Sequence, residues 1–199
     1  MPIDQGDADE ALAQRAATGS RAAFAELVAR HGRGVTLVLR QAVRDEHLAE
    51  DLAQEVWIKV HGALGRFRPG SSFRSWLYAI ALNHMRDALR SARRDRLELR
   101  DDLRPIAPPV EPSAEPEVAE QRRQVEAALA QLREEHRVAL GLIDLAGLGY
   151  AEAAASIGCS LGTLKSRVHR ARAAFRETWA RREAAASTTR HDPAGAPHD

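Results

Sequence analysis

Apolar residues recur at spacings of three and four along most of the chain, and this period predicts helices with one buried face. In the first part of the chain, Phe24, Leu27 and Val28 begin such a pattern. Gly32 and Gly34 follow within it and are expected to mark a bend or a weak point. The pattern as a whole predicts an all-α fold.

The segment after residue 46 carries an apolar stripe and an acidic stripe on opposite faces of one expected helix. The apolar stripe contains Leu48, Leu52 and Val56. The polar face consists of Glu50, Asp51, Gln54 and Glu55. An acidic face is usually no more than a solvated surface, so a protein-binding role stands as the alternative for this one.

Residues 66–73 contain Pro, two Ser and Gly and are predicted to form a loop with Phe67 and Phe73 at its two ends. The helix expected next ends in a run of arginines. Aromatic rings beside a loop, followed by cations, suit single-stranded nucleic acid, because bases stack on rings while cations follow the phosphates. The competing interpretation is that the aromatic rings belong to the core.

Residues 150–176 have the pattern of two helices with a tight break between them. Gly158 can adopt the left-handed conformation that ends the first helix, and Ser160 is placed to cap the second. Leu164, Val168 and Ala171 then lie on one face, opposite small, hydroxyl-bearing and cationic residues. Such a helix suits the DNA major groove, although a basic amphipathic helix can also be a merely solvated surface.

Charge is unevenly distributed although the net charge is only +1. Residues 160–182 hold seven Lys or Arg against one Glu, and residues 101–120 hold six acids against one Arg. Five prolines between residues 105 and 116 indicate an extended, flexible linker. We therefore expect two small helical domains, divided as follows: a flexible arm at 1–19, a first domain at 20–97, a Pro- and acid-rich linker at 98–119, a helix-turn-helix domain at 120–182 and a disordered tail at 183–199.

The sequence contains no arrangement typical of catalysis or metal binding. The eight His residues are scattered, Cys159 is the single cysteine, and there is no phosphate-binding glycine loop. We expect no enzymatic activity, no catalytic residue, no metal and no cofactor. Without a long apolar run or a signal peptide, the chain is expected to be cytoplasmic and not inserted in a membrane.

Three segments in this order resemble bacterial RNA polymerase sigma factors of the extracytoplasmic-function (ECF) type. The residues are HLAEDLAQEVWIKVH from residue 47, FRSWLYAIALNHMRDALRSARR from residue 73, and LGYAEAAASIGCSLGTLKSRVHRARAAFRE from residue 148. The resemblance implies a factor that binds core polymerase and directs promoter-specific transcription initiation. It would recognise the −10 and −35 promoter elements and stabilise melted DNA.

The resemblance also implies site residues. Polymerase binding falls on Asp51, Gln54 and Glu55. Contact with the −10 element falls on Phe67, Arg68, Ser71, Ser72, Phe73, Asn83, Arg86, Arg90, Arg93 and Arg94. Contact with the −35 element falls on Thr163, Lys165, Ser166, Arg167, His169, Arg170 and Arg172, of which Arg167 and Arg172 are expected to touch phosphates.

The expected partners are promoter DNA, the β′ clamp coiled coil and β flap of core RNA polymerase, and an anti-sigma factor. Two alternatives have different consequences. A helix-turn-helix regulator that binds operators alone would need no polymerase, and an all-helical adaptor for an acidic protein would show no dependence on promoter sequence.

Overall fold

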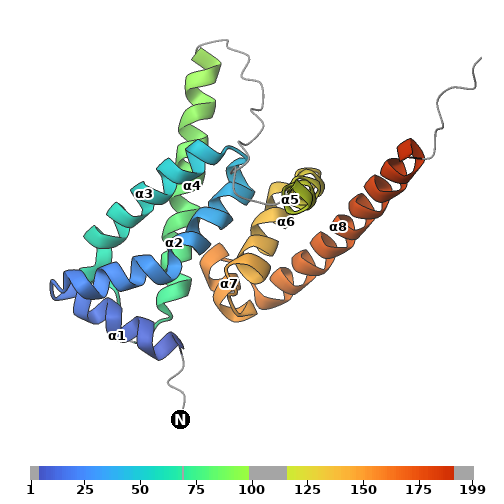
Figure 1. Cartoon of the computed structure of the whole chain (residues 1–199). Helices are drawn as coiled ribbons and strands as arrows, with labels where there is room; N and C mark the ends of the chain where they lie inside the picture. Colours follow the sequence, from blue (N-terminus) through green and yellow to red (C-terminus); the bar gives the residue numbers. More distant parts are fainter. Residues whose placement is uncertain (1–4, 69, 99–115, 191–199) are drawn as a thin grey trace, which may run out of the picture.

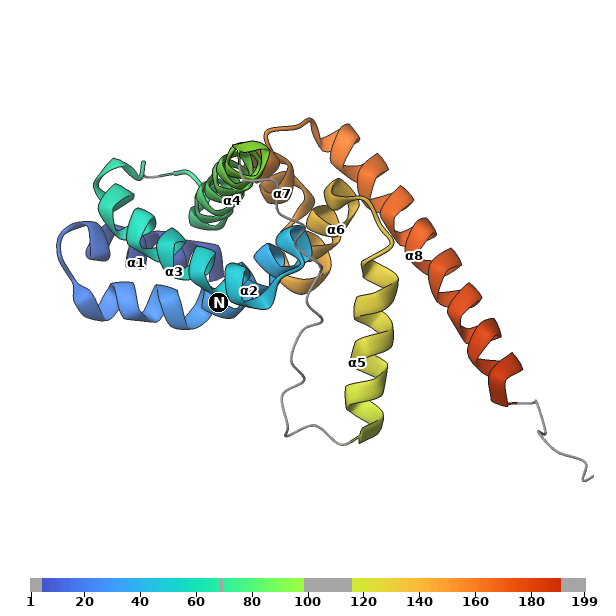
Figure 2. The ribbon, with the colours of Figure 1, turned by 90° about the horizontal axis from the view of Figure 1, so that it is seen from above.

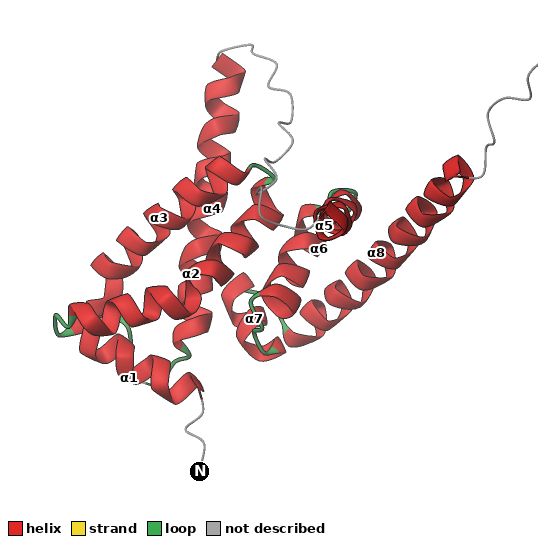
Figure 3. Cartoon of the chain, viewed as in Figure 1, coloured by secondary structure: helices red, strands yellow, loops and turns green. Residues whose placement is uncertain are grey.

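The computed structural model describes residues 5–68, 70–98 and 116–190, and within these ranges it contains helices and loops but no strand (Figure 3). This confirms the all-α prediction. The helices are α1 (Gln5–Ala17), α2 (Arg21–Val43), α3 (Glu46–Ala63), α4 (Phe73–Glu98), α5 (Pro116–Leu129), α6 (Glu134–Leu140), α7 (Tyr150–Ile157) and α8 (Leu161–Arg190). A 3-10 turn, η1 (Leu64–Arg66), follows α3, and a π-helical turn, η2 (Gly141–Leu145), follows α6.

The first domain is formed by α1–α4. Helices α2–α4 bury the apolar stripes expected from the sequence, whereas α1 lies in the segment assigned to the flexible arm and also packs on this core through Ala13 and Ala16. Ser20 caps α2 by accepting the amide of Ala23 at 3.3 Å, and Asp45 caps α3 by accepting the amide of Leu48 at 3.0 Å. The buried side chains of this core include Leu27, Val35, Val38, Leu39, Leu52, Val56, Leu77, Tyr78 and Leu82.

The expected bend at the two glycines is wrong, because α2 runs unbroken from Arg21 to Val43. Gly34 has a packing role instead. A Cβ placed there would come within 2.5 Å of the hydroxyl of Tyr78, which is buried on α4. A Cβ at Gly32 would meet nothing closer than 3.9 Å. The glycine at position 34 therefore permits close contact between α2 and α4.

The two glycines make a matched pair of substitutions. Gly34→Ala should lower the free energy of unfolding by about 1–2 kcal/mol, because the overpacking cost exceeds the gain in helix propensity. Gly32→Ala should be neutral or stabilising by up to about 1 kcal/mol, since alanine favours the helix. Urea denaturation followed by circular dichroism measures both. Equal effects at the two positions would show that Tyr78 can move aside without cost.

The second domain contains the helix-turn-helix at the predicted place. Helix α7 ends at Ile157, Gly158 follows with φ of 79°, and the hydroxyl of Ser160 accepts the amide of Thr163 at 3.1 Å. Leu164, Val168 and Ala171 are buried as expected.

Helix α8 continues to Arg190, past the boundary placed at 182, and α5 starts within the segment assigned to the linker. Residues 99–115 of the linker and 191–199 of the tail lie outside the described residues.

The two domains pack against each other through α4 and α7 and through α2 and α6. Their buried side chains form one continuous core. Figure 1 shows α7 beside α4 and α6 beside α2, while most of α8 projects away from the first domain. The view from above shows the same arrangement, with α5 and α8 diverging (Figure 2). This packing goes beyond the sequence expectation of two modules joined only by a linker.

Candidate polymerase and promoter interfaces

The acidic face of α3 is exposed, as the sequence predicts. Asp51, Gln54 and Glu55 all point to solvent, while Leu52 and Val56 on the other side of the helix are buried. A carboxylate oxygen of Glu55 lies 2.5 Å from Nε2 of His84 on α4, within hydrogen-bonding distance. This contact links the acidic face of α3 to the neighbouring helix.

Ile58 belongs to the same face and was missed by the sequence analysis. Its side chain is 72% exposed, the largest exposure among the large apolar residues that the structure describes. It lies seven positions after Asp51, so the two share one stripe with Gln54 and Glu55. The helical spacing could have revealed this placement, but an isoleucine in an apolar pattern is ordinarily assigned to the core.

The two phenylalanines of the predicted −10 loop lie in the core. Phe73 is 1% exposed and Phe67 is 9% exposed. Their rings pack edge to face with centroids 5.8 Å apart, and Trp76 lies 5.3 Å from Phe67 and 5.9 Å from Phe73. Neither ring offers a free face to a nucleobase in this structure. Of the loop's polar candidates, Arg68 and Ser71 are exposed and Ser72 is half-buried.

The outer face of α4 presents the amide and several of the cations that the sequence analysis selected. Asn83 and Arg90 are exposed, and Arg86 donates to the side-chain oxygen of Asn83 at 3.1 Å. Arg90 forms an ion pair with Asp87 at 2.9 Å. Arg94 is also exposed, whereas the side chain of Arg93 lies outside the described residues. This face therefore joins one hydrogen-bonding amide to a row of cations.

On α8, six of the seven predicted −35 residues are exposed. They are Thr163, Lys165, Ser166, His169, Arg170 and Arg172, whereas Arg167 is half-buried. Two of the seven are held by acids of their own domain: Arg167 pairs with Glu135 at 3.3 Å and Arg172 with Asp144 at 2.6 Å. Asp144 raises the pKa of Arg172 by hydrogen bonding to the guanidinium. Both arginines must share or exchange these partners before they can hold a phosphate.

The contact between the domains covers part of the predicted −10 segment. The hydroxyl of Ser72 donates to the carboxylate of Glu152 on α7 at 2.6 Å. Arg74 lies 3.7 Å from the same carboxylate and donates to the carbonyl of Ala146 at 2.7 Å. Sequence analysis missed this contact, since its partners are far apart in the chain.

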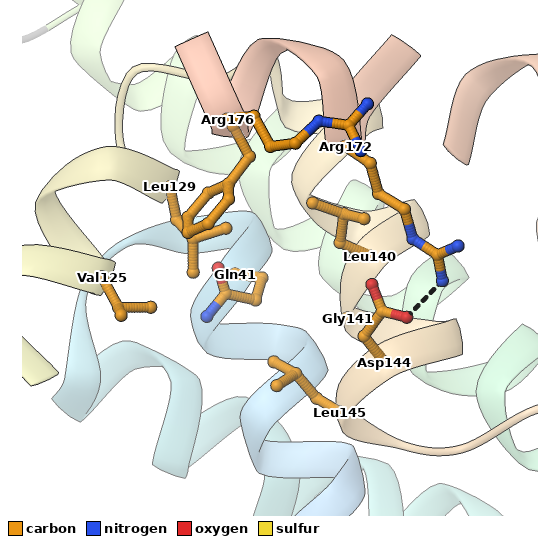
Figure 4. A pocket seen from close by; sticks show the side chains of 10 residues that line it. Gln41, Val125, Leu129, Leu140, Gly141, Asp144, Leu145, Arg172 and Arg176 are labelled. Atoms are coloured by element: carbon orange, nitrogen blue, oxygen red, sulfur yellow. Dashed lines mark hydrogen bonds and ion pairs between the residues drawn. The ribbon is translucent and has the colours of Figure 1, made fainter. Parts of the chain in front are cut away.

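An apolar groove of about 300 Å³ lies where the end of α2 meets the second domain. Figure 4 shows Val125 and Leu129 on one side, Leu140 and Leu145 on another, and the Arg172–Asp144 pair at the edge. Gln41 is the groove's residue from the first domain. Val125 and Leu145 are partly exposed there, at 38% and 44%.

Among the described residues, no helix combines the length and apolarity needed to cross a bilayer.

Comparison with known proteins gives the family. Residues 27–95 match sigma-70 region 2, and residues 122–175 match sigma-70 region 4. The chain is 35% identical over 176 residues to the RNA polymerase sigma-H factor of Pseudomonas aeruginosa, covering 84% of this chain and 91% of that protein. It is 33% identical over 180 residues to the ECF RNA polymerase sigma factor SigE of Mycolicibacterium smegmatis, covering 88% of this chain and 70% of the relative.

A solved structure supports the same assignment. The sigma factor RpoE from Bartonella quintana, in complex with the anti-sigma factor NepR, superimposes with a TM-score of 0.67 at 26% identity, covering 78% of this chain and 95% of that one. Region 2 corresponds to the domain that carries the α3 and α4 faces, and region 4 to the helix-turn-helix domain. The chain belongs to the ECF family of sigma factors, which direct RNA polymerase to promoters.

Proposed function

We propose that this sigma factor docks on the clamp of core RNA polymerase through the exposed stripe of α3. The stripe consists of Asp51, Gln54, Glu55 and Ile58. The observation that carries the proposal is that these side chains face solvent along one line of a helix whose other face is core. A complementary cationic partner would pair with the carboxylates, and an apolar contact with Ile58 would add burial.

Promoter reading is proposed for two separate faces. The exposed residues at the start of α8, Thr163 to Arg170, enter the major groove of the −35 element, where side chains can contact base edges. Asn83 and the arginines of α4 hold the melted strand of the −10 element through a hydrogen bond to a base and contacts to phosphates. A captured base would meet the polar residues Arg68 and Ser71, since the Phe67 and Phe73 rings are buried.

The factor acts by binding, without catalysing a reaction, in the cytoplasm where the polymerase is. Region 4 contacts the β flap. An anti-sigma protein regulates the factor, and the complex of RpoE with the anti-sigma factor NepR supports this by analogy. The apolar groove between α2 and the second domain is a suitable surface for such a partner.

The docking stripe is tested by binding to fluorescently labelled core polymerase. Asp51→Ala combined with Gln54→Ala should weaken binding by about 2 kcal/mol, or roughly 30-fold, because two polar contacts to a charged partner are lost. Ile58→Ala should weaken it by about 1 kcal/mol, through lost apolar burial. The amount of transcript made from a pool of promoter fragments should fall in parallel with polymerase binding. The promoters used by the unmodified factor should share two spaced motifs upstream of their start sites.

A matched control is Glu177→Ala combined with Gln121→Ala, which removes one acid and one amide from exposed positions in the other domain. This control should bind polymerase as the unmodified chain does. Unchanged binding of the α3 variants would remove the stripe from the docking surface. Binding to duplex DNA without any polymerase-dependent transcript would favour the operator-binding alternative.

A further inference from the structure

Helix α1 brings one buried acid to the first domain. Asp9 is only 2% exposed, although α1 lies in the segment that was expected to be a flexible arm. One of its carboxylate oxygens accepts from Nη1 of Arg30 at 3.1 Å, and the other lies 2.8 Å from Nε2 of His31. A carboxylate taken out of water needs such partners, because burying a charge without them is costly. Asp9 therefore fixes α1 on α2 through defined polar contacts.

The two partners of Asp9 differ in their surroundings. The Arg30 side chain is 35% exposed and also donates to Glu26 at 2.8 Å, so it has a second acceptor at the surface. The His31 side chain is 12% exposed. Burial lowers the pKa of His31 despite the neighbouring carboxylate, so at neutral pH the ring is neutral and donates from Nε2 to Asp9. The hydrogen bond between His31 and Asp9 is the better shielded of the two.

The His31 ring also packs against the predicted −10 loop. Its centroid lies 5.8 Å from that of Phe73, the first residue of α4, which is buried. Phe73 in turn packs edge to face with Phe67, which directly follows η1, at 5.8 Å. These two phenylalanines are the ends of the loop. A continuous line of contacts thus runs from Asp9 through His31 to both ends of the −10 loop.

Helix α1 itself packs on the elements at both sides of this loop. It contacts η1, which precedes the loop, and α4, which follows it. Ala13 and Ala16 of α1 belong to the same core as the two phenylalanines. A binding group is held precisely only when the residues behind it are themselves fixed by packing and hydrogen bonds. The support from α1 therefore bears on Arg68 and Ser71, the exposed polar candidates for meeting a captured base.

We propose that Asp9 and His31 are positioning residues for the −10 loop, which hold Phe73 in the arrangement that lets the loop receive an unstacked base. The proposal rests on the proposed function, because it takes this loop as the site of base capture. Neither residue touches DNA: Asp9 acts through His31, and His31 acts through Phe73. Helix α1 thus takes part in −10 recognition although it precedes residues 27–95, the part of the chain that matches region 2.

The test uses core polymerase assembled with each full-length variant and a promoter fragment whose −10 region is mismatched and therefore already melted. A 2-aminopurine base in the −10 strand reports capture, because its fluorescence changes when the base leaves its neighbours and enters a protein site. Binding of the same assemblies to a −35 duplex is measured alongside. Circular dichroism establishes the conditions under which every variant is folded.

Asp9→Leu removes both hydrogen bonds but keeps a side chain of similar size in the buried position of α1. It should lower the affinity for the melted −10 strand about tenfold, the loss expected if the loop then holds its binding arrangement about one time in ten. The 2-aminopurine change should shrink as well. Affinity for core polymerase and for the −35 duplex should stay the same, because neither the α3 stripe nor α8 contacts Asp9.

His31→Leu should reproduce this loss, since it removes the same hydrogen bond and the ring that packs on Phe73. The double variant Asp9→Leu with His31→Leu should be no weaker than His31→Leu alone. Residues that act in series through one contact give non-additive effects, whereas independent structural defects add.

Two further variants serve as controls. Asp9→Asn keeps an acceptor of the same size for His31, while Arg30 retains Glu26, so −10 affinity should return to within about threefold of the unmodified factor. Glu26→Leu removes the other acid that pairs with Arg30, at a position where the side chain is 49% exposed. It should leave binding to every probe unchanged, because an exposed ion pair contributes little.

A folded Asp9→Leu factor that captures the base as the unmodified factor does would overturn the positioning role. Equal losses on the melted −10 strand and the −35 duplex would also overturn it, since a general loss of structure acts on both. The failure of the proposed function looks different. If the unmodified factor itself gave no 2-aminopurine change, the loop would not be the site of base capture, and the positioning role would fall with that assignment.

Discussion

Replacing Phe73 by alanine is expected to lower the free energy of unfolding by about 3–5 kcal/mol, the cost of removing a large aromatic side chain from a core. The Phe73 side chain is 1% exposed. Its ring packs with Phe67, Trp76 and the imidazole of His31, and the centroids of these three rings lie 5.8–5.9 Å from the centroid of Phe73. Urea denaturation monitored by circular dichroism gives the value. The loss should be independent of DNA and polymerase.

This result would separate the two interpretations that the sequence left open for the loop. If Phe73 were a stacking platform, alanine would leave stability unchanged and reduce only the binding of melted DNA. Arg68→Ala provides the comparison, because Arg68 is exposed in the same loop. It should change stability by less than about 0.5 kcal/mol and weaken the binding of a premelted fragment.

Local signals in the sequence were sufficient for the helix-turn-helix. Gly158 and Ser160 end one helix and begin the next through conformations and hydrogen bonds that involve only nearby residues. The apolar period likewise predicted the buried side of α8 and the exposed side of α3. The roles of these exposed faces stay predictions, although the family assignment and their accessibility support them.

Structural features that depend on residues far apart in the sequence could not be predicted from local patterns. Gly34 looked like a helix breaker because its partner, Tyr78, lies on another helix. Arg167 and Arg172 looked available because the acids that hold them precede the helix-turn-helix or lie at its edge. The packing of the two domains requires side chains that no period in the sequence brings together.

Arg137 is the clearest residue of this kind, and Arg137→Met is expected to cost about 3 kcal/mol, because three carbonyls lose a buried charged donor. The guanidinium donates to Leu132 within its own domain and to Gln41 and Ala42 across the interface. Burial lowers the pKa of Arg137, but an arginine remains charged at neutral pH. Its charge therefore faces the negative end of the α2 dipole, where a cation is favoured.

Methionine keeps much of the side-chain volume, so the loss should come from hydrogen bonding and charge rather than from a cavity. Arg133→Met is the matched control: Arg133 is exposed four positions earlier and makes no side-chain capping bond, so it should change stability by less than about 0.5 kcal/mol. Urea denaturation gives the two free energies, and amide hydrogen exchange locates the change. Arg137→Met should lose protection in both the last turn of α2 and the second domain, because this one side chain stabilises both. Loss confined to α6 would mean that Arg137 supports only its own domain and that the interface is held by the Glu152 contact.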